Sequence, residues 1–343
     1  ARTSDDERID WAEMVKACEK HDPFVSLASG GLVHIPEDVQ RLVDFLLSRA
    51  QKREGEQLRF GRYAALSVGQ AVEPYSAGKE ADWQRLRKQL AEAKHCGEAE
   101  LPETLKERLR DYQSEGVAWL DFLEKTGFHG VLADEMGLGK TVQALATITR
   151  RRRDAEVHRP SLVVCPTSLI ENWSLEARRF VPELQTIPVF GLRRDELLKQ
   201  VTAMDLVITS YALLRRDIHH YREVEFDYVI LDEAQHIKNP RTSNARKCKQ
   251  LNAQHRLILT GTPLENSLRE LWSLFDFLLP GMLGSQTEFK RLYEAPYKRG
   301  EINAVHRLSE QTAPFVLRRT KDQVKEQLPP KIEQVVYCEL SAP

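Results

Sequence analysis

The sequence predicts an α/β fold, a three-layer domain in which helices cover both faces of a central, mostly parallel β-sheet. Short apolar runs alternate with amphipathic segments between about residues 130 and 279, as in parallel strands joined by helical crossovers. A strand-to-helix junction with closely spaced glycines lies at residues 133–141. The chain has 343 residues, of which 41% are hydrophobic, so it can bury a sizeable core.

Six runs are predicted to be the strands of this sheet, because each is short, apolar and followed by a helical or turn pattern. They are residues 131–133, 162–165, 187–190, 206–209, 228–231 and 256–259. We assign residues 101–335 to this domain and residues 336–343 to the start of a linker that follows it.

The first hundred residues have a different pattern and are predicted to form a small α+β accessory region, residues 1–100. Residues 24–27, the turn Ser29-Gly30-Gly31 and residues 32–35 resemble a hairpin, and Pro36 opens a helical pattern. The pattern does not indicate what this region does.

After Pro280 the chain becomes polar and mostly helical, and we expect a helical protrusion at about residues 281–316. Between Gln286 and Lys331 there are 10 Lys and Arg against 6 Asp and Glu, a surplus of four positive charges. Two interpretations stay open: a solvated helical face, or a surface for a polyanion.

The overall composition excludes several classes of protein. With 50 basic and 51 acidic residues the net charge is -1, so any nucleic-acid surface must be a local patch. The cysteines lack the spacing of a disulfide framework or zinc site; they are Cys18, Cys96, Cys165, Cys248 and Cys338. No apolar run reaches the length of a membrane span, and residues 1–10 lack a signal peptide's apolar stretch. We therefore expect an intracellular protein, cytoplasmic or nucleoid-associated, with no membrane partner.

Residues 133–141, Ala-Asp-Glu-Met-Gly-Leu-Gly-Lys-Thr, match the ending of a phosphate-binding P-loop. Gly137 and Gly139 allow backbone amides to turn toward a phosphate, and the start of the following helix adds positive potential. Lys140 is predicted to reach the terminal phosphates and the Thr141 hydroxyl to bind magnesium. Asp134 stands where the general pattern has its first glycine. The alternative is a chance match in a polar loop.

The run at 228–231 ends in Asp232-Glu233-Ala234-Gln235, which places two adjacent carboxylates where a parallel strand leaves the sheet. Ligands bind at that edge of such sheets. Asp232 is predicted to hold magnesium, and Glu233 to orient and deprotonate an attacking water. An acidic pair that caps a helix is the alternative, which the P-loop upstream makes less favourable.

These motifs, in this order, resemble those of the SWI/SNF-type family of helicase-like, double-stranded-DNA translocases in helicase superfamily two, over about residues 105–335. Residues 109–113, Leu-Arg-Asp-Tyr-Gln, with Gly116 and Trp119, are similar to its adenine-recognising Q motif, although Asp111 replaces the usual proline.

The resemblance implies a RecA-like P-loop domain that binds ATP and Mg. The implied ATP contacts are Tyr112, Gln113, Asp134, Glu135, Met136, Gly137, Leu138, Gly139, Lys140 and Thr141. The implied catalytic residues are Lys140, Asp232, Glu233 and Gln235, with Thr141 and Asp232 on the metal; the family more often has histidine at the position of Gln235.

Further motifs resemble those that face double-stranded DNA or couple it to ATP. Hydroxyls and backbone amides at strand ends can bind phosphates without reading bases. The implied residues are Pro166, Thr167 and Ser168; Ser210 and Tyr211; Thr260, Gly261 and Thr262; and Arg318, Arg319 and Lys321.

The resemblance also implies a second RecA-like lobe as a partner, because superfamily-two enzymes hydrolyse ATP between two lobes. No second set of motifs follows Lys331 in this sequence. Since an arginine from the other lobe can contribute on the order of 10³–10⁵ in rate, we expect this chain to bind ATP but to hydrolyse it poorly. Protein partners are expected, if anywhere, at the N-terminal region. Two alternatives are a nucleotide-dependent switch or scaffold and a strand-separating helicase of the same superfamily.

Overall fold

The computed structural model describes residues 9–20, 22–27, 29–54, 57–75, 84–85, 88–90, 97, 99–154, 156–261 and 267–329. Its centre is a seven-stranded sheet with the order β11-β5-β10-β9-β6-β8-β7, and every neighbouring pair is parallel. The strands are β5 (Gly130–Leu132), β6 (Ser161–Cys165), β7 (Thr186–Pro188), β8 (Leu206–Ser210), β9 (Glu225–Asp232), β10 (Asn252–Leu259) and β11 (Val316–Leu317). The predicted α/β class with a parallel central sheet is confirmed.

All six predicted strands are present, with ends that differ from the prediction by a few residues. The largest difference is at β10, which begins at Asn252 and not at Arg256. The seventh strand, β11, was not predicted. It has only two residues, and a run of that length carries no periodic signal; it exists because Val316 and Leu317 pair with β5.

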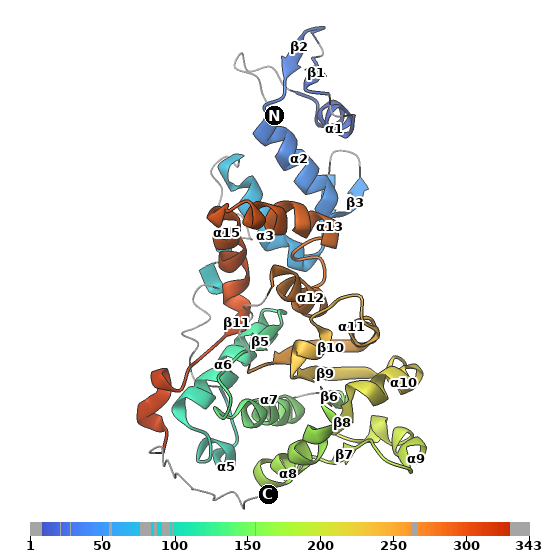
Figure 1. The fold of residues 1–343 in the computed structure, drawn as a ribbon, viewed down its shortest axis with the longest axis vertical. Coiled ribbons are helices and arrows are strands. Elements are labelled where there is room, and N and C mark those ends of the chain that lie inside the picture. The colour runs from blue at the N-terminus through green and yellow to red at the C-terminus, as the bar shows by residue number, and fades with distance from the viewer. Residues whose placement is uncertain are drawn as a thin grey trace, which may run out of the picture.

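Helices cover both faces of the sheet (Figure 1). One layer contains α6 (Asp111–Lys125), α7 (Lys140–Asp154) and α8 (Ile170–Phe180), which pack side by side. The other contains α10 (Tyr211–Tyr221), α11 (Ser243–Cys248) and α12 (Leu268–Leu278). The shorter helices α5 (Glu103–Lys106) and α9 (Arg194–Leu198) lie at the periphery. Because both faces are covered, β6 and β8 are buried along their whole length, as parallel strands usually are.

The predicted protrusion is helical. It contains α13 (Gln286–Phe289), a π-helical turn η7 (Lys290–Glu294), α14 (Ala295–Lys298) and α15 (Ile302–Thr312). The short 3-10 helix η8 (Ala313–Phe315) follows α15 directly and returns the chain to the sheet as β11.

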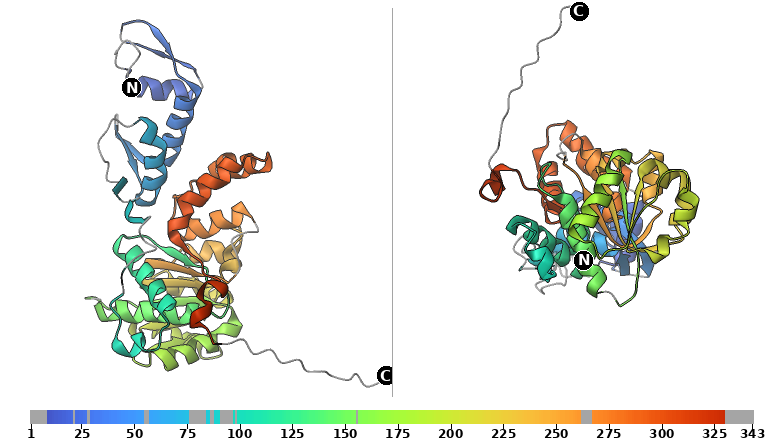
Figure 2. Two further views of the ribbon diagram at one scale, coloured as in Figure 1. Left: turned by 90° about the vertical axis from the view of Figure 1, so that its left-hand side faces the viewer. Right: turned by 90° about the horizontal axis from the view of Figure 1, so that it is seen from below.

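The N-terminal residues form the hairpin and helix that the sequence predicts, here β1 (Phe24–Ser26), β2 (Leu32–His34) and α2 (Glu37–Arg49). They are preceded by α1 (Trp11–Glu19). A second hairpin, β3 (Ala50–Glu54) with β4 (Gln57–Phe60), and the helix α3 (Ala65–Val72) were not predicted. These elements stack at one end of the sheet domain (Figure 2).

Three side chains join the N-terminal elements to the sheet domain. The buried Arg49 donates to the carbonyl oxygens of Gly281 (2.9 Å) and Met282 (2.6 Å) at the base of the protrusion. Arg62 donates to the Thr126 carbonyl oxygen (2.6 Å), and the Tyr63 hydroxyl lies 3.0 Å from His129 Nε2. In the part of the chain that the structure describes, no helix is both long and apolar enough to span a bilayer.

Candidate functional site

The predicted phosphate, metal and coupling motifs meet at one edge of the sheet. The P-loop follows β5, the acidic pair ends β9, and Thr260-Gly261 follows β10, which lies between those two strands. Leu259 pairs with Leu132 on one side and with Asp232 on the other, so the three strands end at the same level. This is the carboxyl edge of the sheet, where ligands of doubly wound folds bind.

The P-loop conformation depends on its two glycines. Gly137 and Gly139 have φ values of 92° and 77°, a left-handed region that side chains with a Cβ rarely adopt. A Cβ on Gly139 would lie 2.3 Å from Gln113 Nε2, so this position also requires a close approach. The turn brings the chain directly into α7 at Lys140.

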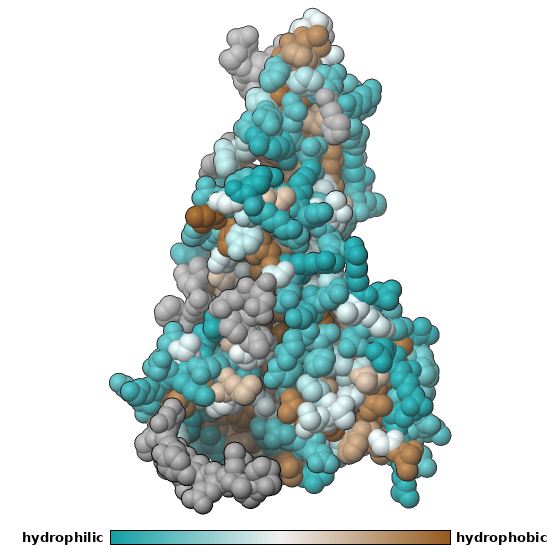
Figure 3. All heavy atoms as spheres, viewed as in Figure 1, coloured by the Kyte–Doolittle hydropathy of each residue, from teal (hydrophilic) through white to brown (hydrophobic). Residues whose placement is uncertain are grey.

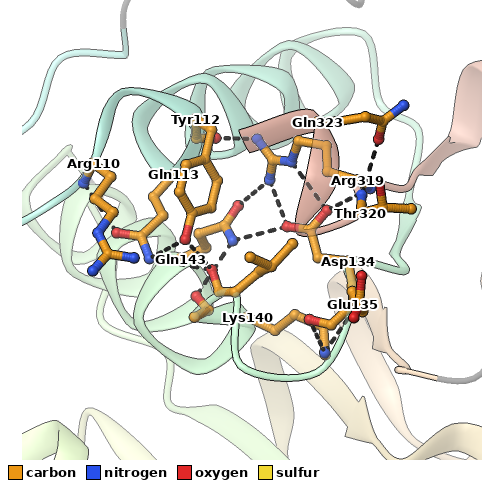
Figure 4. Close-up of polar contacts among 12 residues, drawn as sticks. Arg110, Tyr112, Gln113, Asp134, Glu135, Lys140, Gln143, Arg319, Thr320 and Gln323 are labelled. Atoms are coloured by element: carbon orange, nitrogen blue, oxygen red, sulfur yellow. Dashed lines mark hydrogen bonds and ion pairs between the residues drawn. The ribbon is translucent and has the colours of Figure 1, made fainter. Parts of the chain in front are cut away.

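Lys140 is half-buried beneath the loop, and its Nζ donates to the carbonyl oxygens of Asp134 (2.8 Å) and Glu135 (3.4 Å), as Figure 4 shows. Burial lowers the pKa of Lys140, while the charges of Asp134 and Asp232 raise it. Among the described residues no carboxylate lies within ion-pair distance of this ammonium. A Cβ placed on Gly261 would lie 3.5 Å from Nζ, so this glycine leaves open space beside the charge. An ammonium with no carboxylate partner, inside a glycine-rich loop with backbone N–H groups, is suited to bind a phosphate group.

Asp232 is held by two donors. Trp173 Nε1 donates to Oδ2 (2.9 Å), and the Glu233 backbone N–H donates to Oδ1 (2.9 Å). Burial raises the pKa of Asp232; the Trp173 hydrogen bond lowers it, and the neighbouring Glu233 charge raises it. Trp173 was not among the predicted site residues. It lies on α8 just after the predicted DNA-facing motif at Pro166–Ser168, and it is also a buried core residue.

Glu233 adopts a left-handed backbone conformation (φ 50°, ψ 57°) and is the one non-glycine residue with positive φ in the described part of the chain. Such a conformation costs about 1–3 kcal/mol and persists where the surroundings impose it, often at functional sites. The side chain is half-buried at the sheet edge, next to Asp232. Gln235 lies beyond it, exposed in the short helix η6 (Ala234–Ile237).

The Q-motif residues at the start of α6 bind the underside of the P-loop. Gln113 Oε1 accepts from the Arg110 N–H (3.0 Å), and Nε2 donates to the Leu138 carbonyl oxygen (3.2 Å). The buried Tyr112 hydroxyl donates to the same oxygen (3.1 Å). Both residues therefore hold the loop in this structure, and the use of Gln113 on adenine stays a prediction.

Asp134 explains the departure of this P-loop from the general pattern. Its carboxylate is fully buried and faces Arg319, whose Nε donates to Oδ1 (3.0 Å) and whose Nη2 donates to Oδ2 (2.6 Å). Gln143 Nε2 donates to Oδ2 (3.1 Å), and Gln143 Oε1 accepts from Arg319 Nη2 (2.8 Å). Arg319 also donates to the Tyr112 carbonyl oxygen. Asp134 and Arg319 thus bind each other in this structure, and their expected roles toward ATP and DNA stay predictions. Gln143 was missed by the sequence reasoning.

The segment after β11 follows the P-loop in parallel. The Ala133 N–H donates to the Leu317 carbonyl oxygen (2.7 Å), and the Glu135 N–H donates to that of Arg319 (2.9 Å). Lys321 forms an ion pair with Glu135 (3.7 Å), and Arg318 is exposed. The chain that leaves the protrusion is therefore connected to the phosphate loop by backbone and side-chain contacts.

Two of the predicted DNA-facing motifs lie at the same sheet edge, on the side of β9 away from the P-loop. The structure places Pro166, Thr167 and Ser168 directly after β6, and Ser210 and Tyr211 at the end of β8. Thr167 and Ser168 are exposed, whereas Ser210 is buried and caps α10 by accepting from the Leu213 N–H (3.3 Å). The Tyr211 hydroxyl donates to the Asp232 carbonyl oxygen (2.8 Å), which joins this motif to the acidic pair. Thr260 is buried, and Thr262 lies outside the described residues.

The donor set at this edge fits a magnesium nucleotide. In the described ranges no group of three or more His, Cys, Asp or Glu side chains could hold a metal. Thr141, which is half-buried at the start of α7, and Asp232 are the nearest candidates. Magnesium bound with a nucleotide usually takes only one or two protein ligands, because phosphate oxygens and water supply the others.

Comparison with known proteins gives the family of this chain. The model of the SNF2-related domain matches residues 112–343. The TATA-binding protein-associated factor BTAF1 of Arabidopsis thaliana is 36% identical over 341 residues, which cover 93% of this chain and 16% of that protein. MOT1 of Saccharomyces cerevisiae is 40% identical over 70% of this chain and 14% of its own length. The putative ATP-dependent helicase/translocase YwqA of Bacillus subtilis is 38% identical over 75% of this chain and 28% of its own length.

A solved structure shares the fold. The Sulfolobus solfataricus SWI2/SNF2 ATPase core in complex with dsDNA superposes with a TM-score of 0.63 at 42% identity, covering 71% of this chain and 52% of that one. The chain thus spans about half of this solved ATPase core and less than a third of the curated relatives named above.

Proposed function

This chain belongs to the SNF2-related domain family, and from that premise we propose that it is the ATP-binding lobe of a DNA-dependent ATPase that translocates on double-stranded DNA and remodels protein–DNA complexes. The observation that carries the proposal is the convergence at one sheet edge. The unpaired Lys140 ammonium, the Asp232 and Glu233 carboxylates and Gly261 follow three adjacent strands.

Four side chains at this edge, those of Lys140, Thr141, Asp232 and Glu233, each have a task in phosphoryl transfer. The bound magnesium nucleotide supplies the reacting phosphoryl group and the neutralising charge of the metal. Lys140 binds terminal phosphate oxygens, and Thr141 and Asp232 hold the metal. Glu233, fixed by its strained backbone, orients the attacking water and accepts its proton at a carboxylate oxygen.

Two observations support DNA as the partner of this lobe. The solved relative was determined with dsDNA, and the hydroxyls of Thr167 and Ser168 are exposed after β6 at the same edge. Tyr211 connects the neighbouring motif to the Asp232 backbone, so a change in the DNA-facing turn can reach the metal site. We include an intracellular location in the proposal, because both ATP and DNA are found there.

We further propose that the 343-residue chain by itself hydrolyses ATP slowly. The solved ATPase core is about twice the length that this chain covers. In two-lobed enzymes of this kind, stabilisation of the transferring phosphoryl group by an arginine from the other lobe is worth on the order of 10³–10⁵ in rate.

Two measurements test the proposal together. Binding of a fluorescent ATP analogue with magnesium, and phosphate release with and without duplex DNA, are compared for the wild-type chain, Lys140→Ala and the exposed control Lys20→Ala. We expect nucleotide binding in the wild type and in the control, at least about tenfold weaker binding in Lys140→Ala, and slow turnover in all three.

The two parts of the proposal fail separately. Absence of nucleotide binding in the wild-type chain would contradict the assignment of the site. Rapid DNA-stimulated turnover that Lys140→Ala abolishes would support the ATPase but contradict the expected slow rate. It would then imply that self-association supplies the missing arginine.

A further inference from the structure

A groove of about 440 Å³ lies between the protrusion, the start of α12 and the loop after η6, away from the nucleotide site. Its charged lining consists of Arg241, Arg269, Lys290, Glu294 and Lys298. We call this set, together with Gln286, the basic groove. Four cations face one carboxylate, which leaves a surplus of three positive charges. The surface around α13 and below it is largely hydrophilic (Figure 3).

The cations of the basic groove differ from the arginines at the opposite edge of the sheet. There, Arg150 pairs with Glu124 (2.5 Å) and Arg152 with Asp205 (2.6 Å), so their charge is neutralised within the protein. Among the residues that the structure describes, none of the four groove cations has an ion-pair partner. Arg269 Nε donates to the Gln286 amide oxygen (3.1 Å) once that amide is oriented to match its neighbours. This neutral contact orients the guanidinium without cancelling its charge.

The helix of the protrusion is shaped so that these side chains share one face. Gln286, Lys290, Glu294 and Lys298 follow at every fourth residue through α13, η7 and α14. In a regular α-helix, residues spaced by four positions rotate about the helix axis by about 40° at each step, so such a row leaves one face. The π-helical turn at Lys290–Glu294 has i→i+5 hydrogen bonds and more residues per turn, which compensates part of this rotation. Pro296, which has no N–H to donate, follows directly. The irregular turn therefore keeps the row along the groove.

The basic groove continues the sheet edge that carries the predicted DNA-facing motifs. The ring of His236 in η6 stacks on Tyr211 at the end of β8, with centroids 4.7 Å apart. Arg241 follows η6 in the chain, and Arg269 lies in the first turn of α12. The segment that contacts the end of β8 through His236 thus continues along the chain to Arg241 in the groove.

From these observations, and resting on the function proposed above, we infer that the basic groove binds the phosphate backbone of duplex DNA as a second contact beside the strand-end motifs. Two guanidinium groups suit phosphate because they offer paired donors in one plane. The groove is lined by polar and charged residues alone, without the aromatic or aliphatic anchors that protein interfaces use at their centre. An acidic protein is therefore the less suitable occupant.

The salt dependence of DNA binding measures the inferred contact. Each neutralised phosphate adds about 0.9 to the slope of log affinity against log salt concentration. Lys290→Ala/Lys298→Ala should therefore lower the magnitude of that slope by about 1.8, and weaken binding on the order of 10- to 60-fold at about 0.1 M salt. Fluorescence anisotropy of a labelled duplex with the 343-residue chain provides both values.

A matched double variant controls for the loss of two charges. Lys20 and Arg153 are exposed and lack an ion pair in the described structure; Lys20 lies at the end of α1, and Arg153 at the end of α7 opposite the P-loop. Lys20→Ala/Arg153→Ala should leave the slope within about 0.5 of the wild-type value. Binding of the ATP analogue should be unchanged in both double variants, because neither touches the nucleotide site.

The outcomes separate this inference from the proposed function. A wild-type chain that binds no duplex at low salt would overturn the proposed function itself. Duplex binding with the same slope in Lys290→Ala/Lys298→Ala, or an equal loss in the control, would overturn the groove assignment alone. A last outcome is that poly-glutamate competes with labelled duplex as well as unlabelled duplex of equal charge does, and only when the groove is intact. That result would show that the groove binds acidic polypeptides, and it would also overturn the groove assignment.

Discussion

Replacement of Arg319 by alanine is expected to destabilise the sheet domain and to loosen the P-loop at the same time. Arg319 is the only described cation that contacts the fully buried Asp134 carboxylate, which lies within the loop itself. Without the guanidinium, a buried charge would remain with hydrogen bonds only from neutral groups. That arrangement is costly because desolvation of the charge is no longer offset by an opposite charge.

The magnitude follows from the contacts that remain. Removal of one partner from a buried ion pair costs about 3–5 kcal/mol. Two donors would stay on Asp134 in the variant, the backbone N–H of residue 319 (3.1 Å) and Gln143 Nε2 (3.1 Å). We therefore expect the low end of the range, about 3 kcal/mol. Asp134→Ala/Arg319→Ala leaves no charge unpaired, so its cost should be smaller than the sum of the two single variants by about 1–3 kcal/mol.

Equilibrium urea unfolding, followed by tryptophan fluorescence, measures these free energies. Lys325→Ala is the matched control, since Lys325 is exposed in the same C-terminal segment, and its change should stay within about 0.5 kcal/mol. Affinity for the ATP analogue is measured in parallel under folding conditions, and should fall in Arg319→Ala because the loop loses its anchor. A loss of stability below about 1 kcal/mol, or strictly additive single variants, would refute this reasoning.

Three other perturbations address the same site and the opposite sheet edge. Gly116→Ala should cost about 1–3 kcal/mol, because its Cβ would lie 1.9 Å from Gln143 Oε1; an unchanged Tm would contradict this. Glu233→Gly should relieve the strain of the left-handed backbone and raise the free energy of unfolding by about 1 kcal/mol. Glu233→Gln should keep nucleotide binding without that gain in stability. Equal stabilities of the two variants would refute the strain. Burial holds the pKa of His129 at about 3, so its neutral form favours folding above pH 6.5 and this contribution is lost as the pH falls toward 3. Between pH 7 and 5.5 the His129 contribution is a drop in the free energy of unfolding of up to about 1.4 kcal/mol per pH unit, which His129→Gln should subtract from the total; the buried His255, whose pKa is about 4, should keep its own part of the drop. A variant with the same pH dependence as the wild type would exclude a contribution from His129.

Much of the fold and site could be predicted from local pattern. The strands β5, β6 and β8 and most of β9 are buried on both faces, so each contains a nearly continuous apolar run that stands out between polar segments. The P-loop and the acidic pair were recognisable because backbone turning and metal binding need particular residue types at short, fixed spacings. Lys140 and Asp232 were therefore predicted to bind the nucleotide and its metal, and the family resemblance assigned Gly261 to a coupling motif; the structure brings all three to one sheet edge.

The tertiary structure decided the contacts between residues that are far apart in the chain. Asp134 meets Arg319, and Trp173 meets Asp232, because the order of strands brings their loops together, and no local period encodes that order. The strand β11 exists only through pairing with β5. The basic groove likewise combines side chains from the protrusion, from α12 and from the loop after η6. Sequence by itself therefore determined which residues could bind a nucleotide. Packing decided which charges are buried as pairs and which stay available to a ligand, since burial depends on neighbours that only the folded chain supplies.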